Sequence, residues 1–144
     1  MKNNIKELQF ISRKYILDSI YNAQSSHVGS ALSCIDILIA NLLFLKEKNK
    51  VTSLETLEKI ILSKGHGASA FYGLLSCFDK SIDPKKYYQN NSWYTGHISH
   101  EIKHITHSTG SLGHGLPVAC GIAFANRKKF LSVILSDGEI QEGS

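Results

Sequence analysis

The sequence predicts an α/β fold in which a parallel sheet is flanked by helices, and three observations support that prediction. Residues 60–62 and 130–135 are short apolar runs with the composition of buried strands. Longer stretches with helical periodicity lie before and between them. The second run is apolar on both faces, which is typical of a central parallel strand covered by helices. We therefore expect a single domain. Its sheet is expected to be incomplete, because the sequence contains just these two clear strands.

The N-terminal third is predicted to form two amphipathic helices. Apolar side chains recur at helical spacing through residues 4–24, and the polar stretch 25–30 ends that helix. A second helix is predicted to begin at Ser33, because Asp36 three residues later completes a capping box. Residues 46–52 are polar and are predicted to connect this helix to the next element.

Strands and helices alternate in the remainder of the chain. The strand at 60–62 runs into a glycine turn, and a helix is predicted over 68–78. Residues 79–111 lack sustained periodicity and are predicted to form a long loop with one helical turn near 84–88. A loop of this length in a compact domain is usually functional. The glycines at 110–115 are predicted to open a third helix before the last strand.

Composition limits the classes of function. The net charge of +4 is spread along the chain, whereas a nucleic-acid groove has clustered basic residues with interleaved aromatics, so no nucleic-acid partner is expected. Cys34, Cys77 and Cys120 are far apart, which predicts reduced thiols. The N-terminus lacks an apolar leader, and the longest apolar run, 37–45, is too short to span a bilayer. We therefore expect a cytoplasmic protein without a membrane partner.

The residues after the last strand have the chemistry of a metal–phosphate site. Asp137 and Gly138 follow that strand, and ligands of open α/β sheets bind at the carboxyl ends of strands. A carboxylate there can hold Mg²⁺, which shares its oxygen ligands with phosphates. The glycine lets the backbone N–H approach an anion. An Asp-Gly pair is also a common turn, so a plain strand-to-helix turn stays open as the alternative.

Seven histidines lie between His27 and His114. Three of them, His27, His66 and His97, lie in glycine-containing loops, where we expect them to be exposed. A histidine so placed can bind a phosphate or a sugar hydroxyl, or move protons near neutral pH. The four histidines in 97–107 also have spacings that permit a zinc site, although no cysteine is near. Zinc binding and plain surface roles stay open as alternatives.

The glycine loop at 110–115 differs from the common nucleotide motifs. Its order, GxxGxG, lacks the Lys of a P-loop, and a poor strand precedes it. Neither a P-loop nor a dinucleotide fingerprint is therefore expected.

Four segments, in order, resemble the N-terminal part of transketolases, which depend on thiamine diphosphate and Mg²⁺. SSHVGS (25–30) resembles the family's Gly-His-x-Gly segment, and LSKGHG (62–67) its Leu-Ser-x-Gly-His-Gly block. YTGHIS (94–99) and STGSLGHG (108–115) resemble its Gly-His-Pro-Glu and Thr-Gly-Pro-Leu-Gly-Gln-Gly pair. SDGEIQEGS (136–144) resembles its Gly-Asp-Gly motif, and its sequence is most similar to the form found in the N-terminal subunit of split transketolases.

The resemblance implies a partial, thiamine-diphosphate-binding (PP-type) domain over residues 1–144, truncated after the Asp-Gly motif. His66 would contact the cofactor diphosphate. Asp137 would bind Mg²⁺, and Gly138 would donate its N–H to the diphosphate. The backbone of three loop residues would line the aminopyrimidine side of the cofactor: Gly110, Ser111 and Leu112.

The resemblance also implies catalytic roles. His27 and His97 would face the sugar substrate and, with His66, would stabilise the reacting groups and move protons. Glu142 would lie at an interface between subunits. Five places depart from the family pattern and leave the sugar specificity open: Ser26, residues 98–99, Ser111, His114 and Ser136.

The implied activity is a transketolase-like transferase of carbohydrate metabolism that moves a two-carbon ketol unit between sugar phosphates. The family's second Mg²⁺ ligand and its cofactor-activating Glu lie beyond the matched residues. We therefore expect this chain to be inactive alone and to act with a C-terminal transketolase subunit or domain, in a homodimer or heterotetramer. Two alternatives stay open: a related enzyme (deoxyxylulose-phosphate synthase or a 2-oxo-acid dehydrogenase component), and a non-catalytic module that packs against a partner.

Overall fold

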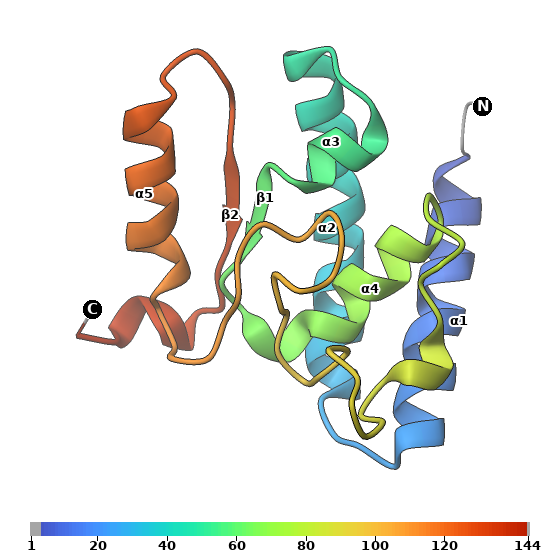
Figure 1. Ribbon diagram of the computed structural model, residues 1–144. Coiled ribbons are helices and arrows are strands. Elements are labelled where there is room, and N and C mark those ends of the chain that lie inside the picture. The colour runs from blue at the N-terminus through green and yellow to red at the C-terminus, as the bar shows by residue number, and fades with distance from the viewer. Residues whose placement is uncertain (1–3, 144) are drawn as a thin grey trace.

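A layer of helices packs against a two-stranded parallel sheet in the computed structural model, which describes residues 4–143 (Figure 1). The helices are α1 (Ile5–Ala23), α2 (Val28–Asn49), α3 (Ser53–Leu57), α4 (Ala68–Ser76) and α5 (Gly115–Ala125). The strands are β1 (Ile60–Leu62) and β2 (Ser132–Ile134). Three short 3-10 helices complete the order: η1 (Gly65–Gly67), η2 (Pro84–Lys86) and η3 (Gly138–Gln141).

The first helix lies where it is expected, but the second is longer than predicted at both ends. α2 begins directly after His27, whose left-handed conformation (φ 75°) turns the chain into the helix. Ser33 therefore lies inside α2, where its hydroxyl donates to the Ser30 carbonyl (3.0 Å) and caps nothing. At the other end, the start of the predicted connection at 46–52 is helical, because Lys and Glu are good helix formers.

The short helix α3 is absent from the sequence prediction. The Thr52 hydroxyl accepts from the Glu55 backbone N–H (3.3 Å), and the Glu55 carboxylate accepts from the Thr52 backbone N–H (2.9 Å). These reciprocal bonds make a capping box, which satisfies donors that the first turn of a helix leaves free.

The core lies among α1, α2 and α4. Every residue from 68 to 75 in α4 is buried, and the helix ends at Ser76, two residues earlier than predicted. α1 and α4 approach so closely at Gly73 that an added Cβ would lie 2.8 Å from the Ser12 carbonyl oxygen. Large, fully buried side chains come from all three helices: Leu8, Ile16, Ile35, Leu38, Phe71 and Tyr72.

Helix α2 is long and apolar enough to cross a membrane, by length and composition alone. It packs against α1 and α4 and contributes one face to their shared core, including Ile35, Leu38 and Leu42. The core helix of a globular domain passes the same test of length and composition, so α2 is weak evidence for a membrane span.

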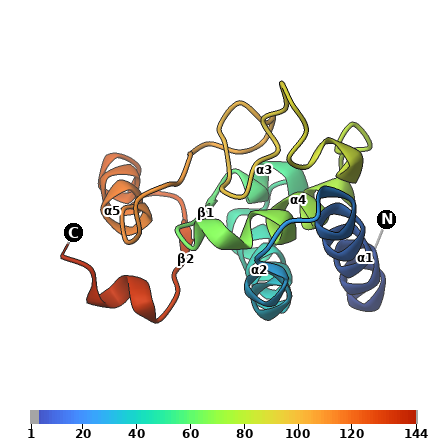
Figure 2. The same ribbon diagram turned by 90° about the horizontal axis from the view of Figure 1, so that it is seen from below.

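The strands pair in parallel, as predicted, with Ile60 opposite Ser132 and Leu62 opposite Ile134. Figure 2 shows the sheet between α5 on one side and the layer of α1, α2 and α4 on the other. β1 is fully buried. The expected central position of β2 is wrong for the described residues, because β1 is its one neighbour there and two of its three residues are only half-buried.

The long loop between α4 and α5 contains one helical turn, η2, at the predicted place. The loop is anchored by apolar side chains that reach the main core: Ile82, Tyr87, Ile98, Ile102 and Ile105. α5 follows where the third helix is predicted, and Ala119 is its single buried residue.

Candidate functional site

The fold brings together three histidines that are far apart in the sequence. The His66 ring lies between the other two, with its centroid 4.6 Å from that of His27 and 4.8 Å from that of His97. His27 immediately precedes α2, His66 lies in η1 and His97 lies in the long loop. Each is half-buried, whereas the sequence predicts exposed rings, because the rings pack against one another.

Packing forces the glycine turn that presents His66. A Cβ added to Gly65 would lie 2.5 Å from both His97 Cδ2 and Thr109 Oγ1, so a side chain at this position would push the loop away. On the other side of His66, a Cβ added to Gly67 would lie 2.9 Å from Cys34 Sγ. The two glycines therefore allow His66 to approach both α2 and the long loop.

The backbone of His97 is held by two hydroxyl groups. Tyr72 of α4 donates to the His97 carbonyl oxygen (3.1 Å), and Thr95 donates to the same oxygen (2.8 Å). Burial, followed by the nearby His66 and His27 rings, lowers the pKa of His97 below its usual value. The His97 ring is therefore neutral near neutral pH and can accept a proton.

The predicted cofactor residues of the glycine loop lie on the surface. Gly110, Ser111 and Leu112 are exposed, and the loop then turns through Gly113, which has a left-handed conformation (φ 80°). A Cβ added to Gly110 would meet nothing within 4 Å. The open space beside Gly110 leaves its backbone accessible to a ligand.

Two pockets lie near this part of the chain. Gly110 and Ser111 line a pocket of about 200 Å³, together with Val118 of α5. A larger pocket of about 400 Å³ is lined by residues of the long loop between Ser81 and Lys103, and none of the predicted site residues lines it. The smaller pocket therefore includes part of the predicted cofactor loop, but His66, Asp137 and Gly138 do not line it.

Asp137 and Gly138 lie at the carboxyl end of β2, where the sequence predicts a metal–phosphate site. Both are exposed, and a Cβ added to Gly138 would meet nothing within 4 Å. Mg²⁺ is usually bound by one or two carboxylates together with waters and phosphate oxygens. A single exposed carboxylate beside an open glycine fits that donor set. Glu142 is also exposed.

The zinc alternative has no ligand set in residues 4–143, where no group of three His, Cys, Asp or Glu side chains is close enough to hold a metal ion. His97 belongs to the histidine cluster. The other three histidines of 97–107 bond to separate groups: His100 to Ser108, His104 to Glu58, and His107 to the Leu62 backbone N–H.

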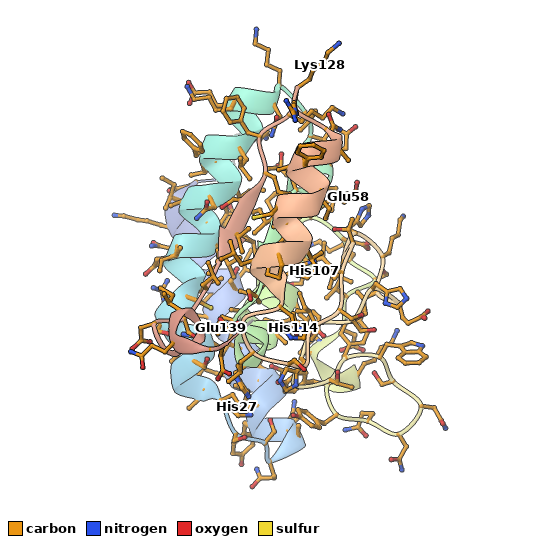
Figure 3. All side chains as sticks on the ribbon, turned by 90° about the vertical axis from the view of Figure 1, so that its left-hand side faces the viewer. His27, Glu58, His107, His114, Lys128 and Glu139 are labelled. Carbon is orange, nitrogen blue, oxygen red and sulfur yellow. The ribbon has the colours of Figure 1, made fainter. Side chains whose placement is uncertain are left out.

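Sequence reasoning missed Glu139, a buried carboxylate that connects the parts of the site. It is 4% exposed and lies near the first turn of α5 (Figure 3). One oxygen accepts from Ser63 Oγ (2.7 Å) and Gly113 N (3.0 Å), and the other from Ser136 N (2.8 Å) and Ser136 Oγ (3.1 Å). A carboxylate beside an Asp-Gly turn was the one signal in the sequence.

The hydrogen bonds keep Glu139 ionised in spite of its burial. Burial raises the pKa of the carboxyl, but the bonds from Ser136, Gly113 and Ser63 outweigh it and hold the pKa below its usual value. An ionised carboxylate accepts hydrogen bonds and donates none, which suits the four donors around it.

Comparison with known proteins gives a consistent family. The model of the transketolase thiamine diphosphate binding domain matches residues 5–144. An apulose-4-phosphate transketolase subunit of Actinobacillus succinogenes is 34% identical over an alignment of 150 residues, gaps included, which covers 96% of this chain and 53% of that protein. The protein of the same name from Phocaeicola vulgatus is 32% identical over 143 residues, covering 92% of this chain and 50% of that protein.

A transketolase of Buchnera aphidicola from Acyrthosiphon pisum is 36% identical over 129 residues, which cover 85% of this chain and 19% of that longer protein. The chain thus spans about half the length of the two apulose-4-phosphate transketolase relatives. These matches confirm the resemblance and the expected fold class. The chain belongs to the transketolase family and carries its thiamine diphosphate binding domain over residues 5–144.

Proposed function

We propose that this chain supplies the diphosphate-binding part of a transferase that moves a two-carbon ketol unit between sugar phosphates. The observation that supports it best is the cluster of His27, His66 and His97, whose rings lie 4.6 and 4.8 Å apart in sequence motifs of the family. Three half-buried imidazoles can hydrogen-bond sugar hydroxyls and exchange protons near neutral pH.

The predicted cofactor residues have the chemistry to hold thiamine diphosphate with Mg²⁺. In this proposal His66 and the Gly138 N–H bind the diphosphate, Asp137 binds Mg²⁺, and the backbone of residues 110–112 lines the aminopyrimidine. When bound, the cofactor would supply the nucleophilic carbon that ketol transfer requires. His97, neutral because its pKa is lowered, accepts a proton from a substrate hydroxyl, and His27 orients the sugar.

The relatives also support a partner. Two of them are named as one subunit of a transketolase, which implies a second subunit. We therefore propose a C-terminal transketolase subunit or domain as the partner, in a homodimer or heterotetramer. The same two relatives are named for apulose 4-phosphate, which makes that sugar phosphate the first substrate to test. Cys34, Cys77 and Cys120 are free thiols, in keeping with a cytoplasmic location.

Calorimetric titration of thiamine diphosphate tests the assignment, using the complete natural polypeptide assembled with its partner. Asp137→Ala is expected to abolish the Mg²⁺-dependent part of the binding, and His66→Ala to weaken binding or turnover. Asp18→Asn is the matched control, because Asp18 is paired with Lys14 on the surface of α1. Unchanged binding in Asp137→Ala would overturn the site assignment.

A ketol-transfer assay with sugar phosphates separates this activity from the alternatives. Transfer that depends on His27 and His97 supports a transketolase. Cofactor binding with transfer of another unit would point to a related thiamine-diphosphate enzyme. An assembly that binds no cofactor would leave a non-catalytic module as the function of this chain.

A further inference from the structure

We propose that Glu139 is a positioning residue, whose buried carboxylate fixes the predicted cofactor loop and the predicted metal turn relative to His66. The inference rests on the proposed function, because it concerns the same site. The carboxylate of Glu139 bonds to none of the residues assigned to catalysis. It therefore acts through the residues that it does bond to, which are Ser63, Gly113 and Ser136.

The first segment that Glu139 fixes is the glycine loop. Gly113 N donates to Glu139 Oε1 (3.0 Å), and the chain turns at Gly113 through a left-handed conformation. At the other end of the loop, Thr109 N donates to the Ile98 carbonyl oxygen (3.1 Å). The exposed residues 110–112 therefore lie between two anchored positions, and without the bond to Glu139 they would be held at one end.

The second segment is the turn after β2. Ser136 N and Oγ both donate to Glu139 Oε2, at 2.8 and 3.1 Å. These bonds close a short turn that contains just Asp137 and Gly138. The carboxylate of Glu139 thus sets the direction of the Asp137 side chain and of the Gly138 N–H, although it binds neither.

The third segment leads to the histidine cluster. Ser63 Oγ donates to Glu139 Oε1 (2.7 Å), and Ser63 lies three positions before His66 at the end of β1. A Cβ added to Gly115 would collide with the Ser63 side chain, so the start of α5 packs directly on this serine. One carboxylate thereby connects the ends of both strands with the start of α5.

The chemistry of the contact favours a carboxylate over an amide. Both oxygens face donors, and an ionised carboxylate accepts at both. Glu139→Gln keeps the size of the side chain but places an NH₂ group against either the Ser136 donors or those of Ser63 and Gly113. We therefore expect the amide variant to release one side of the network.

The test compares Glu139→Gln with Glu47→Gln, a change at an exposed position of α2, in the complete polypeptide with its partner. Backbone hydrogen exchange is measured first. Exchange in residues 110–113 and 136–139 is expected to rise in Glu139→Gln alone, while exchange in α1 and α4 stays as in wild type. Unchanged exchange at both segments would overturn the inference, whatever the cofactor result.

Thiamine diphosphate affinity with Mg²⁺ is measured next. Glu139→Gln is expected to weaken it by about 10- to 100-fold, the usual effect of removing a partner that orients ligands. Wild-type affinity in this variant would also overturn the inference. If wild type itself binds no thiamine diphosphate, the proposed function fails, and the exchange result still decides whether Glu139 fixes the two segments.

A second, milder variant keeps the test informative if Glu139→Gln unfolds the protein. Ser63→Ala removes one of the four hydrogen bonds and leaves the carboxylate with its other donors. We expect a smaller loss of affinity than in Glu139→Gln, with exchange at residues 110–113 and 136–139 between the rates of wild type and Glu139→Gln. Ser53→Ala is the control, because Ser53 lies at the start of α3, away from Glu139. If Ser63→Ala showed the same exchange rates and cofactor affinity as this control, the proposed hydrogen-bond network around Glu139 would be contradicted.

Discussion

The helical layer of α1, α2 and α4 and the C-terminal unit of β2, α5 and η3 differ in how much of their apolar surface is buried. α4 buries all but one of its residues, whereas α5 buries one. Phe71 in α4 is 0% exposed, and Phe124 in α5 is 73% exposed. Two helices with similar apolar composition thus have opposite environments.

This difference coincides with a division of the candidate site. The histidine cluster lies on the packed side, where α2, α4 and the anchored loop fix its geometry. Asp137 and Gly138 lie on the open side, which exposes several large apolar groups: Leu116, Val118, Ile122, Phe124, Phe130 and Ile140. Contiguous exposed apolar surface is typical of protein contacts, and the partner proposed above would cover it.

Two phenylalanine substitutions test the comparison with the largest expected effect. Phe71→Ala leaves a cavity in the core and is expected to lower the free energy of unfolding by about 3–5 kcal/mol. Phe124→Ala removes an exposed ring and its stacking with Arg127, and is expected to cost about 1 kcal/mol or less. Urea titration of the two variants measures the difference, and equal losses would show that α5 is packed in solution.

Two glycine substitutions sharpen the same contrast. Gly73→Ala places a methyl group 2.8 Å from the Ser12 carbonyl oxygen and is expected to destabilise the protein by about 1–3 kcal/mol. Gly121→Ala in α5 meets nothing within 4 Å and is expected to stabilise the helix by about 0.5–1 kcal/mol. Opposite signs in thermal unfolding support the comparison. A loss of stability in Gly121→Ala would mean that α5 contacts another surface there.

The parts predicted from the sequence are those with local signals. The strand at 60–62 and the helical turn near Pro84 have local composition and turn residues. The capping box of Thr52 and Glu55 was equally local, so α3 could have been found from the sequence. The early start of α2 was harder to predict, because it depends on the left-handed backbone of His27.

The links between the parts of the site were not predictable, because they join residues that are distant in sequence. Ser63 and Glu139 are 76 positions apart, and no periodicity or motif pairs them. The order of the motifs placed the three histidines in one site, but a sequence motif could not give the order of the rings or their burial. The exposure of α5 was hidden for the same reason, since its composition is typical of a core helix.

Acid pH is expected to weaken the contact between β1 and the long loop that His107 makes, and so to lower the stability of the fold. His107 is buried and accepts a hydrogen bond from Leu62 N (3.0 Å), which requires an unprotonated ring nitrogen, and burial lowers its pKa. The unfolded chain therefore binds this proton at a higher pH than the folded chain. Stability is expected to fall as the pH drops below about 6.5, by at most about 1.4 kcal/mol per pH unit.

Urea titrations between neutral and mildly acidic pH measure this effect. His107→Gln keeps an acceptor for the Leu62 N–H but does not titrate, so its stability is expected to depend less on pH than that of wild type. His100→Gln is the control, because His100 is exposed on the same loop. An identical pH dependence in His107→Gln and wild type would contradict the assignment of the proton to His107.

The smallest expected effect is a change in one titration within the histidine cluster. Burial lowers the pKa of His97, and the His66 and His27 rings lower it further when they carry charge. His66→Asn is therefore expected to raise the pKa of His97 toward its usual value, and His27→Asn to raise it less. NMR titration of histidine-labelled protein measures both changes, with His100→Asn as the control. A His97 titration that is the same in all three variants would mean that the rings do not meet in solution, and the packed side of the site would lose the geometry on which its chemistry depends.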